Sequence, residues 1–137
     1  APAAVAGTPM DFSTPHLIGE RIDTDTDQLR WARGYDHTYI LDKELGKLAI
    51  ASRCSSPKTG IVMEVYTDQP GVQLYTGNWM SGNLRGKHDH RYPARAALCL
   101  ETQHYPDSPN KPEYPSTRLN PGETFRSTTI FRFTLKA

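Results

Sequence analysis

The chain lacks the features that define several large protein classes. Its 137 residues contain only two cysteines, Cys54 and Cys99, which are too few for the disulfide framework of a small secreted domain. Sixteen basic residues stand against fifteen acidic ones, and the formal net charge is +1. The basic residues are scattered, so the sequence has no basic stripe of the kind that nucleic acid requires. No apolar run approaches the roughly 20 residues of a membrane-spanning helix. We therefore expect neither nucleic acid nor membrane as a partner.

The N-terminal residues also lack the pattern of a secretory signal. Residues 1–6 have neither a charged start nor a long apolar middle. A signal that has already been cleaved would leave a similar start, so the sequence leaves export open. Cys99 stands in an apolar run, where a free thiol behaves as a small hydrophobic side chain. We predict that Cys54 and Cys99 are reduced, and that the protein is soluble and cytoplasmic, with a periplasmic or secreted location as the alternative.

Apolar residues are scarce as well. They make up 36% of the chain even when tyrosine is included, whereas about 45 to 50% is usual for a globular domain. The length fits one domain. We therefore expect the chain to bury part of its surface against a partner that it does not itself contain.

What the sequence does contain is short strand-like segments. Residues 124–135 alternate between polar and apolar side chains with a period of two, which predicts a strand after the turn at Asn120-Pro121-Gly122. No segment sustains a helical period, so the predicted fold class is all-β. Further strands are predicted over short stretches rich in β-branched or aromatic residues, at residues 39–41, 48–53, 61–67, 72–76 and 96–101.

Other segments predict turns, one short helix and long loops. Pro70-Gly71 fits the centre of a type II turn, in which the glycine accepts a positive φ. Residues 23–29 combine acids and hydroxyls suited to helix N-caps, and they predict one short helix. Residues 81–93 and 105–121 predict irregular loops, and the second is rich in proline. Long loops in a compact domain are often functional.

Glu101 is the most promising acid for catalysis. It follows Ala96–Leu100, a short run that is apolar on both faces and therefore predicts a strand packed on two sides. Its carboxylate would then lie at the rim of a core, where it would be partly shielded from solvent. Desolvation raises a carboxyl pKa toward neutrality, where the group can accept and return protons. The pattern predicts a general base.

Two other segments present polar groups beside predicted strands. Asp36 lies two residues after a glycine in Gly34-Tyr35-Asp36-His37. Its carboxylate either binds a ligand or accepts a hydrogen bond from the backbone of its own turn. Gln73 alternates with Tyr75 on the strand that leads to Trp79. Amides match sugar hydroxyls, and aromatic faces cover the apolar faces of a sugar ring. The alternative is that the two aromatic residues are ordinary core or edge residues.

His88 and His90 are the only residues whose spacing suggests a metal, because alternate residues of a strand point the same way. A third ligand is missing nearby, and the flanking residues are charged, which favours a solvated loop. No serine or cysteine stands in a local context typical of a nucleophile.

Several motifs, taken together and in order, resemble the C-terminal part of the aldose 1-epimerases, also known as galactose mutarotases. The resemblance extends from the first residues nearly to the last. The segments that carry it are Gly7-Thr8-Pro9-Met10-Asp11-Phe12, Gly34-Tyr35-Asp36-His37, residues 64–78, Cys99-Leu100-Glu101-Thr102-Gln103 and Leu119-Asn120-Pro121-Gly122-Glu123-Thr124.

This resemblance implies a fold and a function. The fold is a large antiparallel β-sandwich, and the activity interconverts the α and β anomers of aldohexoses such as glucose and galactose in carbohydrate metabolism. The residue matching Glu101 is the general base, the residue matching Asp36 binds sugar hydroxyls, and the amide matching Gln73 lines the same site. The reaction moves only protons, so no cofactor is implied, and no metal site either.

The chain departs from the family in its histidines. The family's general acid is a histidine of the N-terminal half, and none of the five histidines here stands in that context. We therefore expect residues 1–137 to form the C-terminal portion of one β-sandwich domain, with the remaining N-terminal portion or a second copy as partner. Two alternatives are a sugar-binding β-sandwich without turnover and a metal-binding module built on His88 and His90.

Overall fold

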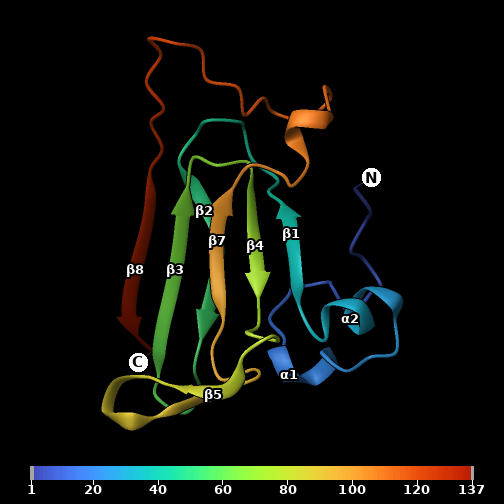
Figure 1. Cartoon of the computed structure of the whole chain (residues 1–137), viewed down its shortest axis with the longest axis vertical. Coiled ribbons are helices and arrows are strands. Elements are labelled where there is room, and N and C mark those ends of the chain that lie inside the picture. Colours follow the sequence, from blue (N-terminus) through green and yellow to red (C-terminus); the bar gives the residue numbers. More distant parts are fainter. Residues whose placement is uncertain (1, 137) are drawn as a thin grey trace. The chain divides into compact units, whose positions relative to one another are not determined.

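The computed structural model describes residues 2–136, and antiparallel strands dominate it (Figure 1). The predicted all-β class is confirmed, and two short α-helices accompany the strands, one of which was predicted. Among the described residues, no helix is long and apolar enough to cross a membrane. In chain order the elements are α1 (Ile18–Arg21), α2 (Asp27–Ala32), β1 (Asp36–Ile40), β2 (Ala49–Ser55), β3 (Ile61–Thr67), β4 (Gly71–Tyr75), β5 (Ser81–Arg85), the 3-10 turn η1 (Lys87–Asp89), β6 (Arg91–Pro93), β7 (Cys99–Gln103), the 3-10 turn η2 (Ser108–Asn110) and β8 (Thr129–Leu135).

The chain forms two compact units. The first contains the chain up to His37 together with Leu74–Cys99, and the second contains Thr38–Gln73 and the chain from Leu100 onward. The β5–β6 hairpin belongs to the first unit, and the sheet of order β2-β3-β8 belongs to the second. A third sheet has the order β1-β4-β7 and contributes residues to both units.

Strands predicted from alternation and composition are largely present. The strand predicted at residues 61–67 is β3, and β1, β2, β4 and β7 overlap their predicted ranges. The last strand begins only at Thr129, because β3 ends at Thr67, its partner in the register. Before that point the backbone N–H of Thr128 donates instead to the carboxylate of Asp68, at 2.7 Å.

Two expectations about irregular and helical segments were wrong. Residues 81–93 were predicted to form an irregular loop, but β5 and β6 pair there as an antiparallel hairpin. Helix α1 was not predicted, since it has four residues and no buried side chain that would produce a periodic pattern. Helix α2 begins at Asp27, within the predicted range, although Thr26 at the N-cap makes no capping hydrogen bond with its side chain.

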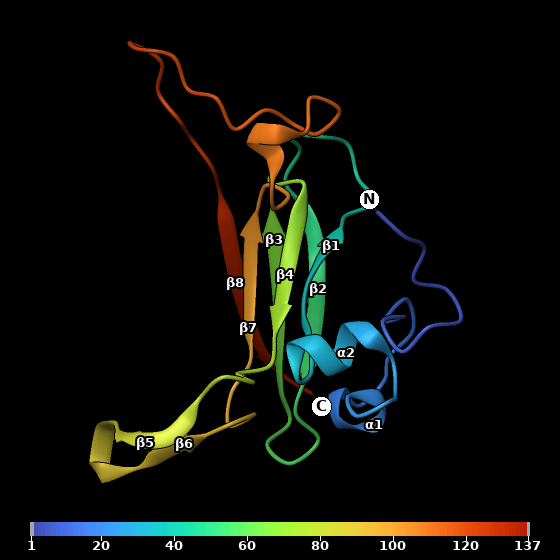
Figure 2. The ribbon, with the colours of Figure 1, turned by 45° about the vertical axis from the view of Figure 1, so that its right-hand side comes forward.

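In the second unit, two layers of strands pack face to face. Figure 2 shows β4 and β7 in front of β3. The side chains between the layers include Val65 and Thr67, both fully buried, and Val72, which is 4% exposed. Thr102 of β7 and Thr129 of β8 share a hydrogen bond of 2.6 Å across the interior. Leu100 and Thr102 therefore point inward, and alternation turns Glu101 and Gln103 to the outer face of β7.

Farther along the same inner face, β3 and β8 carry apolar side chains that the described residues leave open to solvent. The register pairs Ile61 with Leu135, Met63 with Phe133 and Val65 with Phe131. Phe133 is 63% exposed and Leu135 74% exposed, and Ile61 and Phe131 are also exposed. We call these four exposed residues, Ile61, Phe131, Phe133 and Leu135, the open apolar row. The expectation that the chain buries surface against a further partner stays a prediction.

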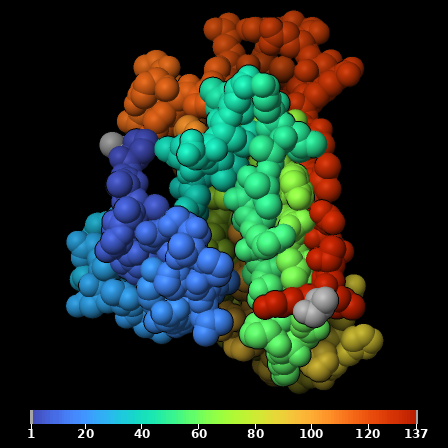
Figure 3. Space-filling model, turned by 180° about the vertical axis from the view of Figure 1, so that it is seen from behind, coloured from blue at the N-terminus to red at the C-terminus, as the bar shows by residue number. Residues whose placement is uncertain are grey.

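The outer face of the same sheet carries a charged cross-strand ladder. Figure 3 shows this side, with β8 in red alongside the green strands. Glu64 lies opposite Arg53 on one side and Arg132 on the other. It accepts hydrogen bonds from Arg53 Nε at 2.9 Å and from Arg132 Nη1 at 3.4 Å. The hydrogen bonds from Arg53 contribute most to a pKa of Glu64 that lies below its usual value. A hydrogen bond from Tyr66 and the positive charges of Arg53 and Arg132 lower the pKa of Glu64 further.

The first unit has its own small core around Tyr35. The Tyr35 ring is fully buried, and its hydroxyl donates to the carbonyl of Pro9 at 3.0 Å. The ring of Phe12 meets it edge to face, with centroids 5.2 Å apart. Leu29 of α2 and Ile22 are buried in the same unit.

An ion pair ties the loop after β6 to the helices of the first unit. The Arg95 guanidinium donates to both carboxylate oxygens of Asp23, at 2.9 and 2.7 Å. It also donates to the carbonyl of Arg33, the C-cap of α2, at 3.0 Å. The hydrogen bonds with Arg95 lower the pKa of Asp23 and raise that of Arg95.

Candidate functional site

Glu101 lies at the centre of β7 and is exposed. The prediction of a strand packed on both faces was wrong, because Ala96 and Ala97 lie before the strand and are exposed, as is Cys99. Only the face with Leu100 and Thr102 is covered. The partial desolvation predicted for Glu101 is therefore absent from the part of the chain that the structure describes.

A hydrogen-bonded row of polar side chains lies on the same sheet face as Glu101. The Thr38 hydroxyl of β1 donates to Gln73 Oε1 of β4. Gln103 Nε2 of β7 donates to the Thr38 hydroxyl at 3.4 Å. Glu101 is two residues before Gln103, so alternation places its carboxylate on this face too. Gln73 and Glu101, which were predicted separately from sequence, thus share one polar surface.

Gly71 explains how residues of the two flanking strands meet. It lies two residues before Gln73 on β4, the central strand, and so belongs to the same face. A Cβ atom at Gly71 would lie 3.0 Å from Thr38 Cγ2 and 3.2 Å from the Tyr105 ring. With no side chain there, Gln103 reaches Thr38 across β4. The prediction of a type II turn with positive φ at this glycine was wrong, because Gly71 is the first residue of a strand and is not among the residues with positive φ.

Asp36 belongs to the first unit. It is half-buried and is the first residue of β1, two residues before Thr38 on that strand. Its backbone N–H donates to His37 Nδ1 at 3.0 Å. Burial lowers the pKa of His37, and the charge of Asp36 opposes that shift only in part. An Nδ1 that accepts a hydrogen bond requires an unprotonated nitrogen, so both observations favour the neutral imidazole.

The residues around Asp36 and after Gln73 build the core of the first unit. Asn78 Nδ2 donates to the carbonyls of Ala32 and Tyr35, both at 2.9 Å, and its Oδ1 accepts from the Thr76 hydroxyl at 2.6 Å. Gly34 has φ +141°, and a Cβ there would lie 2.4 Å from Asn78 Oδ1. Gly34, Thr76 and Asn78, which belong to the motifs quoted above, therefore have a structural role in the first unit.

The two aromatic residues after Gln73 have partners within the first unit. The hydroxyl of Tyr75 accepts a hydrogen bond from the backbone N–H of Trp79 at 3.2 Å. Trp79 is 54% exposed, and the Arg33 guanidinium lies over its ring, 4.6 Å from the centroid. This favours a structural role for the pair, and stacking on a sugar stays a prediction.

His88 and His90 lie in and beside η1, in the exposed hairpin connection. Their ring centroids are 6.4 Å apart. Residues 2–136 contain no group of three or more histidine, cysteine, aspartate or glutamate side chains that could hold a metal ion. The exposure of His88 and His90 therefore supports the interpretation of this segment as a solvated loop rather than a metal site.

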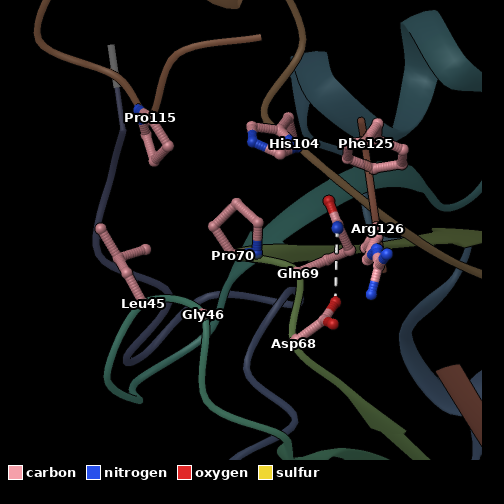
Figure 4. Close-up of a pocket in the computed structure, with 9 residues that line it drawn as sticks. All are labelled: Leu45, Gly46, Asp68, Gln69, Pro70, His104, Pro115, Phe125 and Arg126. Carbon is pink, nitrogen blue, oxygen red and sulfur yellow. Dashed lines mark hydrogen bonds between the residues drawn. The ribbon is translucent and has the colours of Figure 1, made fainter. Parts of the chain in front are cut away.

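A cavity of about 260 Å³ lies in the second unit, where β3 ends and β4 begins (Figure 4). In the close-up, His104 and Phe125 lie on one side of Gln69, and Asp68 lies on the other, 3.4 Å from Gln69 Nε2. Asp36, Gln73 and Glu101 do not line it. The other lining residues are Leu45, Gly46, Pro70, Pro115 and Arg126.

Sequence reasoning overlooked Thr38, Gly71 and Gln103 as parts of the polar face. A signal was available for two of them, since Thr38 is two residues after Asp36 and Gln103 is two residues after Glu101. In strands, that spacing puts side chains on one face. Gly71 had been attributed to a turn.

Comparison with known proteins identifies the family of this chain. The sequence model of the family described as Aldose 1-epimerase matches residues 2–132. Galactose mutarotase of Mus musculus is 41% identical over 133 residues, covering 97% of this chain and 37% of that protein. Aldose 1-epimerase of Escherichia coli (strain K12) is 36% identical over 133 residues, covering 95% of this chain and 38% of that protein. The chain thus spans less than two fifths of the length of these relatives.

A solved structure shares the fold. It is a GalM/aldose epimerase homologue from C. elegans, and it superposes with a TM-score of 0.81 at 24% identity, covering 98% of this chain and 39% of that one. This likeness confirms the predicted β-sandwich fold for the chain.

Proposed function

Because this chain belongs to the aldose 1-epimerase family, we propose that it carries the base of an enzyme that interconverts the α and β anomers of aldohexoses such as glucose and galactose. The observation that carries the proposal is that Glu101 and Gln73 lie on one polar sheet face, on which hydrogen bonds join Gln103, Thr38 and Gln73. Glutamate is a usual general base, and an amide and hydroxyls suit a neutral sugar.

The reaction moves two protons. The Glu101 carboxylate removes the proton from the anomeric hydroxyl, while an acid protonates the ring oxygen and the bond between C1 and the ring oxygen breaks. The sugar becomes an open aldehyde, and rotation about the C1–C2 bond presents the other face of the carbonyl. The reverse transfers close the ring to the other anomer. A positioned acid or base contributes about 100- to 10,000-fold, and no electron or group leaves the sugar, so the reaction requires no cofactor.

The remaining site residues follow from the motifs. We assign Asp36 to binding sugar hydroxyls and Gln73 to lining the same site. The general acid is proposed to be a histidine from a segment outside these 137 residues. Among the histidines present, His37 is poorly placed to act as the general acid, because burial lowers its pKa and so disfavours the protonated form, and its Nδ1 accepts a hydrogen bond.

We further propose that the chain is the C-terminal portion of a larger β-sandwich. The open apolar row supports this proposal, because exposed side chains such as Phe133 and Leu135 lie on the inner face of a sheet. Additional strands would cover them and would also surround Glu101, thereby supplying the desolvation that this chain lacks. The mass of the intact gene product tests the proposal, which requires a product two to three times longer than this chain.

The proposed compartment is the cytoplasm. Cys54 is half-buried and Cys99 exposed, and both are free. Burial raises the pKa of the Cys54 thiol, which keeps it in its unreactive form. Free thiols such as these suit a reducing compartment. Fractionation of cells that express the tagged gene product tests this assignment.

Polarimetry on the complete gene product tests the activity. Freshly dissolved α-galactose or α-glucose relaxes slowly to its equilibrium rotation, and we expect catalytic amounts of the protein to accelerate that relaxation. The sugar-binding alternative predicts a different result, in which galactose binds by calorimetry but relaxes at the rate of the buffer control. A metal analysis of the same preparation tests the module built on His88 and His90, which requires a stoichiometric ion.

A further inference from the structure

The hydrogen bonds between Gln103, Thr38 and Gln73 have a fixed direction. Gln103 Nε2 can only donate, so the Thr38 oxygen is the acceptor in the bond of 3.4 Å. The single proton of the Thr38 hydroxyl is then directed to Gln73 Oε1. The carbonyl end of the Gln73 amide therefore faces Thr38.

An amide group is planar, and its two ends point in different directions. When Oε1 of Gln73 faces Thr38, Nε2 is turned away from Thr38, and the N–H donors of this amide lie on the other side. We propose that Thr38 is a positioning residue that holds the Gln73 amide with its N–H donors directed at an oxygen of the bound sugar. This inference rests on the proposed function of the polar face.

The direction of the amide matters for the reaction. A sugar hydroxyl can donate or accept, but the ring oxygen only accepts, and O1 becomes an acceptor as Glu101 removes its proton. An N–H donor stabilises the negative charge that develops on O1, whereas a carbonyl oxygen in its place repels that charge. An amide in the reverse orientation would present its carbonyl oxygen there instead.

Gly71 and Gln103 complete the arrangement. The methyl group of Thr38 lies over Gly71, where an added Cβ would come within 3.0 Å of Thr38 Cγ2. This close packing limits the rotation of the Thr38 side chain. The bond from Gln103 occupies the hydroxyl oxygen as acceptor, so the hydroxyl proton is left to Gln73.

Two matched pairs of variants test the role of the Thr38 hydroxyl in the complete gene product. Thr38→Val keeps the shape of the wild-type side chain and removes the hydroxyl. Thr38→Ser and Thr38→Ala both lose the methyl group and differ from each other only in the hydroxyl. We expect Thr38→Val to lower kcat/KM for galactose by roughly 10- to 100-fold relative to wild type, and Thr38→Ala to be lower than Thr38→Ser by a similar factor. If Thr38→Val does not fold, the second pair still makes the comparison.

A double-mutant cycle separates positioning from a structural effect. In a Gln73→Ala background there is no amide to orient, so removal of the Thr38 hydroxyl is expected to change kcat/KM by less than about twofold. The inference is overturned if Thr38→Val retains the wild-type kcat/KM, or if its loss is as large in the Gln73→Ala background. A wild-type protein that fails to accelerate mutarotation overturns the proposed function instead, so the two failures are distinguishable.

Discussion

Asn78 holds Tyr35 in place through its side-chain amide, whose Nδ2 donates to the backbone carbonyl of Tyr35 at 2.9 Å. The same nitrogen donates to the carbonyl of Ala32 at the end of α2. Tyr35 immediately precedes Asp36, the predicted sugar ligand. A buried amide therefore fixes the backbone from which that carboxylate projects.

Replacing Asn78 should destabilise the protein. Asn78→Ala removes the amide donor from the buried carbonyls of Tyr35 and Ala32 and takes the shorter of two acceptors from the Thr76 hydroxyl. We expect the free energy of unfolding to fall by about 2 kcal/mol. Urea denaturation measures the loss. Asn83→Ala, in the exposed β5–β6 hairpin, is the matched control and should change the value by less than about 0.5 kcal/mol. Equal effects of the two substitutions would contradict this role of Asn78.

Gly34 should not tolerate a side chain. Its φ of +141° disfavours other residues, and a Cβ would lie 2.4 Å from Asn78 Oδ1. We expect Gly34→Ala to lower the free energy of unfolding by at least about 2 kcal/mol. Because Asn78→Ala removes the clashing atom, the double variant should lose less than the sum of the two single losses. Simple additivity in urea denaturation would exclude the predicted clash.

Glu64 should contribute to stability above its ordinary pKa and lose that contribution in acid. Its pKa in the folded protein lies below the usual value of 4.5, chiefly because of the hydrogen bonds from Arg53. The unfolded state therefore binds the proton first, and this contribution falls as the pH drops from about 4.5 through the folded pKa. Glu64→Gln should lower Tm at pH 7, and its Tm should fall less than that of wild type between pH 5 and pH 3.5. If the Tm of wild type and that of Glu64→Gln fall in parallel over this pH range, the lowered pKa of Glu64 is refuted.

His37 should produce a pH dependence in a different window. Burial lowers its pKa from 6.5, so the folded state disfavours the charged form. Its contribution is present above about pH 6.5 and is lost as the pH falls from that value through the lower folded pKa. His37→Asn keeps an acceptor near the position of Nδ1 but does not titrate. We expect the difference in Tm between wild type and variant to favour wild type at pH 7.5 and to shrink toward pH 5.

The open apolar row should cause residues 1–137 to self-associate when they are expressed alone. Its exposed phenylalanines lie on an inner sheet face, where apolar contact with another molecule is favourable. Sedimentation velocity should show association that depends on concentration, and Phe131→Thr with Phe133→Thr should reduce it. Ile130→Thr is the control, because Ile130 is also exposed but lies on the opposite face of β8. A monomeric wild-type chain would contradict the expectation.

The sequence predicted the interior strands better than the surroundings of the site. Alternation and β-branched residues were sufficient for β3, whose Val65 and Thr67 are fully buried. The packing of Glu101 could not be derived, because an apolar run such as Ala96–Leu100 does not tell whether strands from other segments cover its second face. The row from Gln103 to Gln73 required tertiary information, since it depends on the absence of a side chain at Gly71 on the strand between them.

The rate of galactose mutarotation by the Glu101→Gln variant of the complete gene product tests the central claim most directly. Glutamine keeps the size of the side chain but cannot accept the proton, so we predict a loss in kcat of at least about 100-fold. Glu113→Gln, the same substitution at an exposed position in the loop that follows η2, should retain wild-type activity. A Glu101→Gln variant that relaxes α-galactose as fast as wild type would show that Glu101 is not the base.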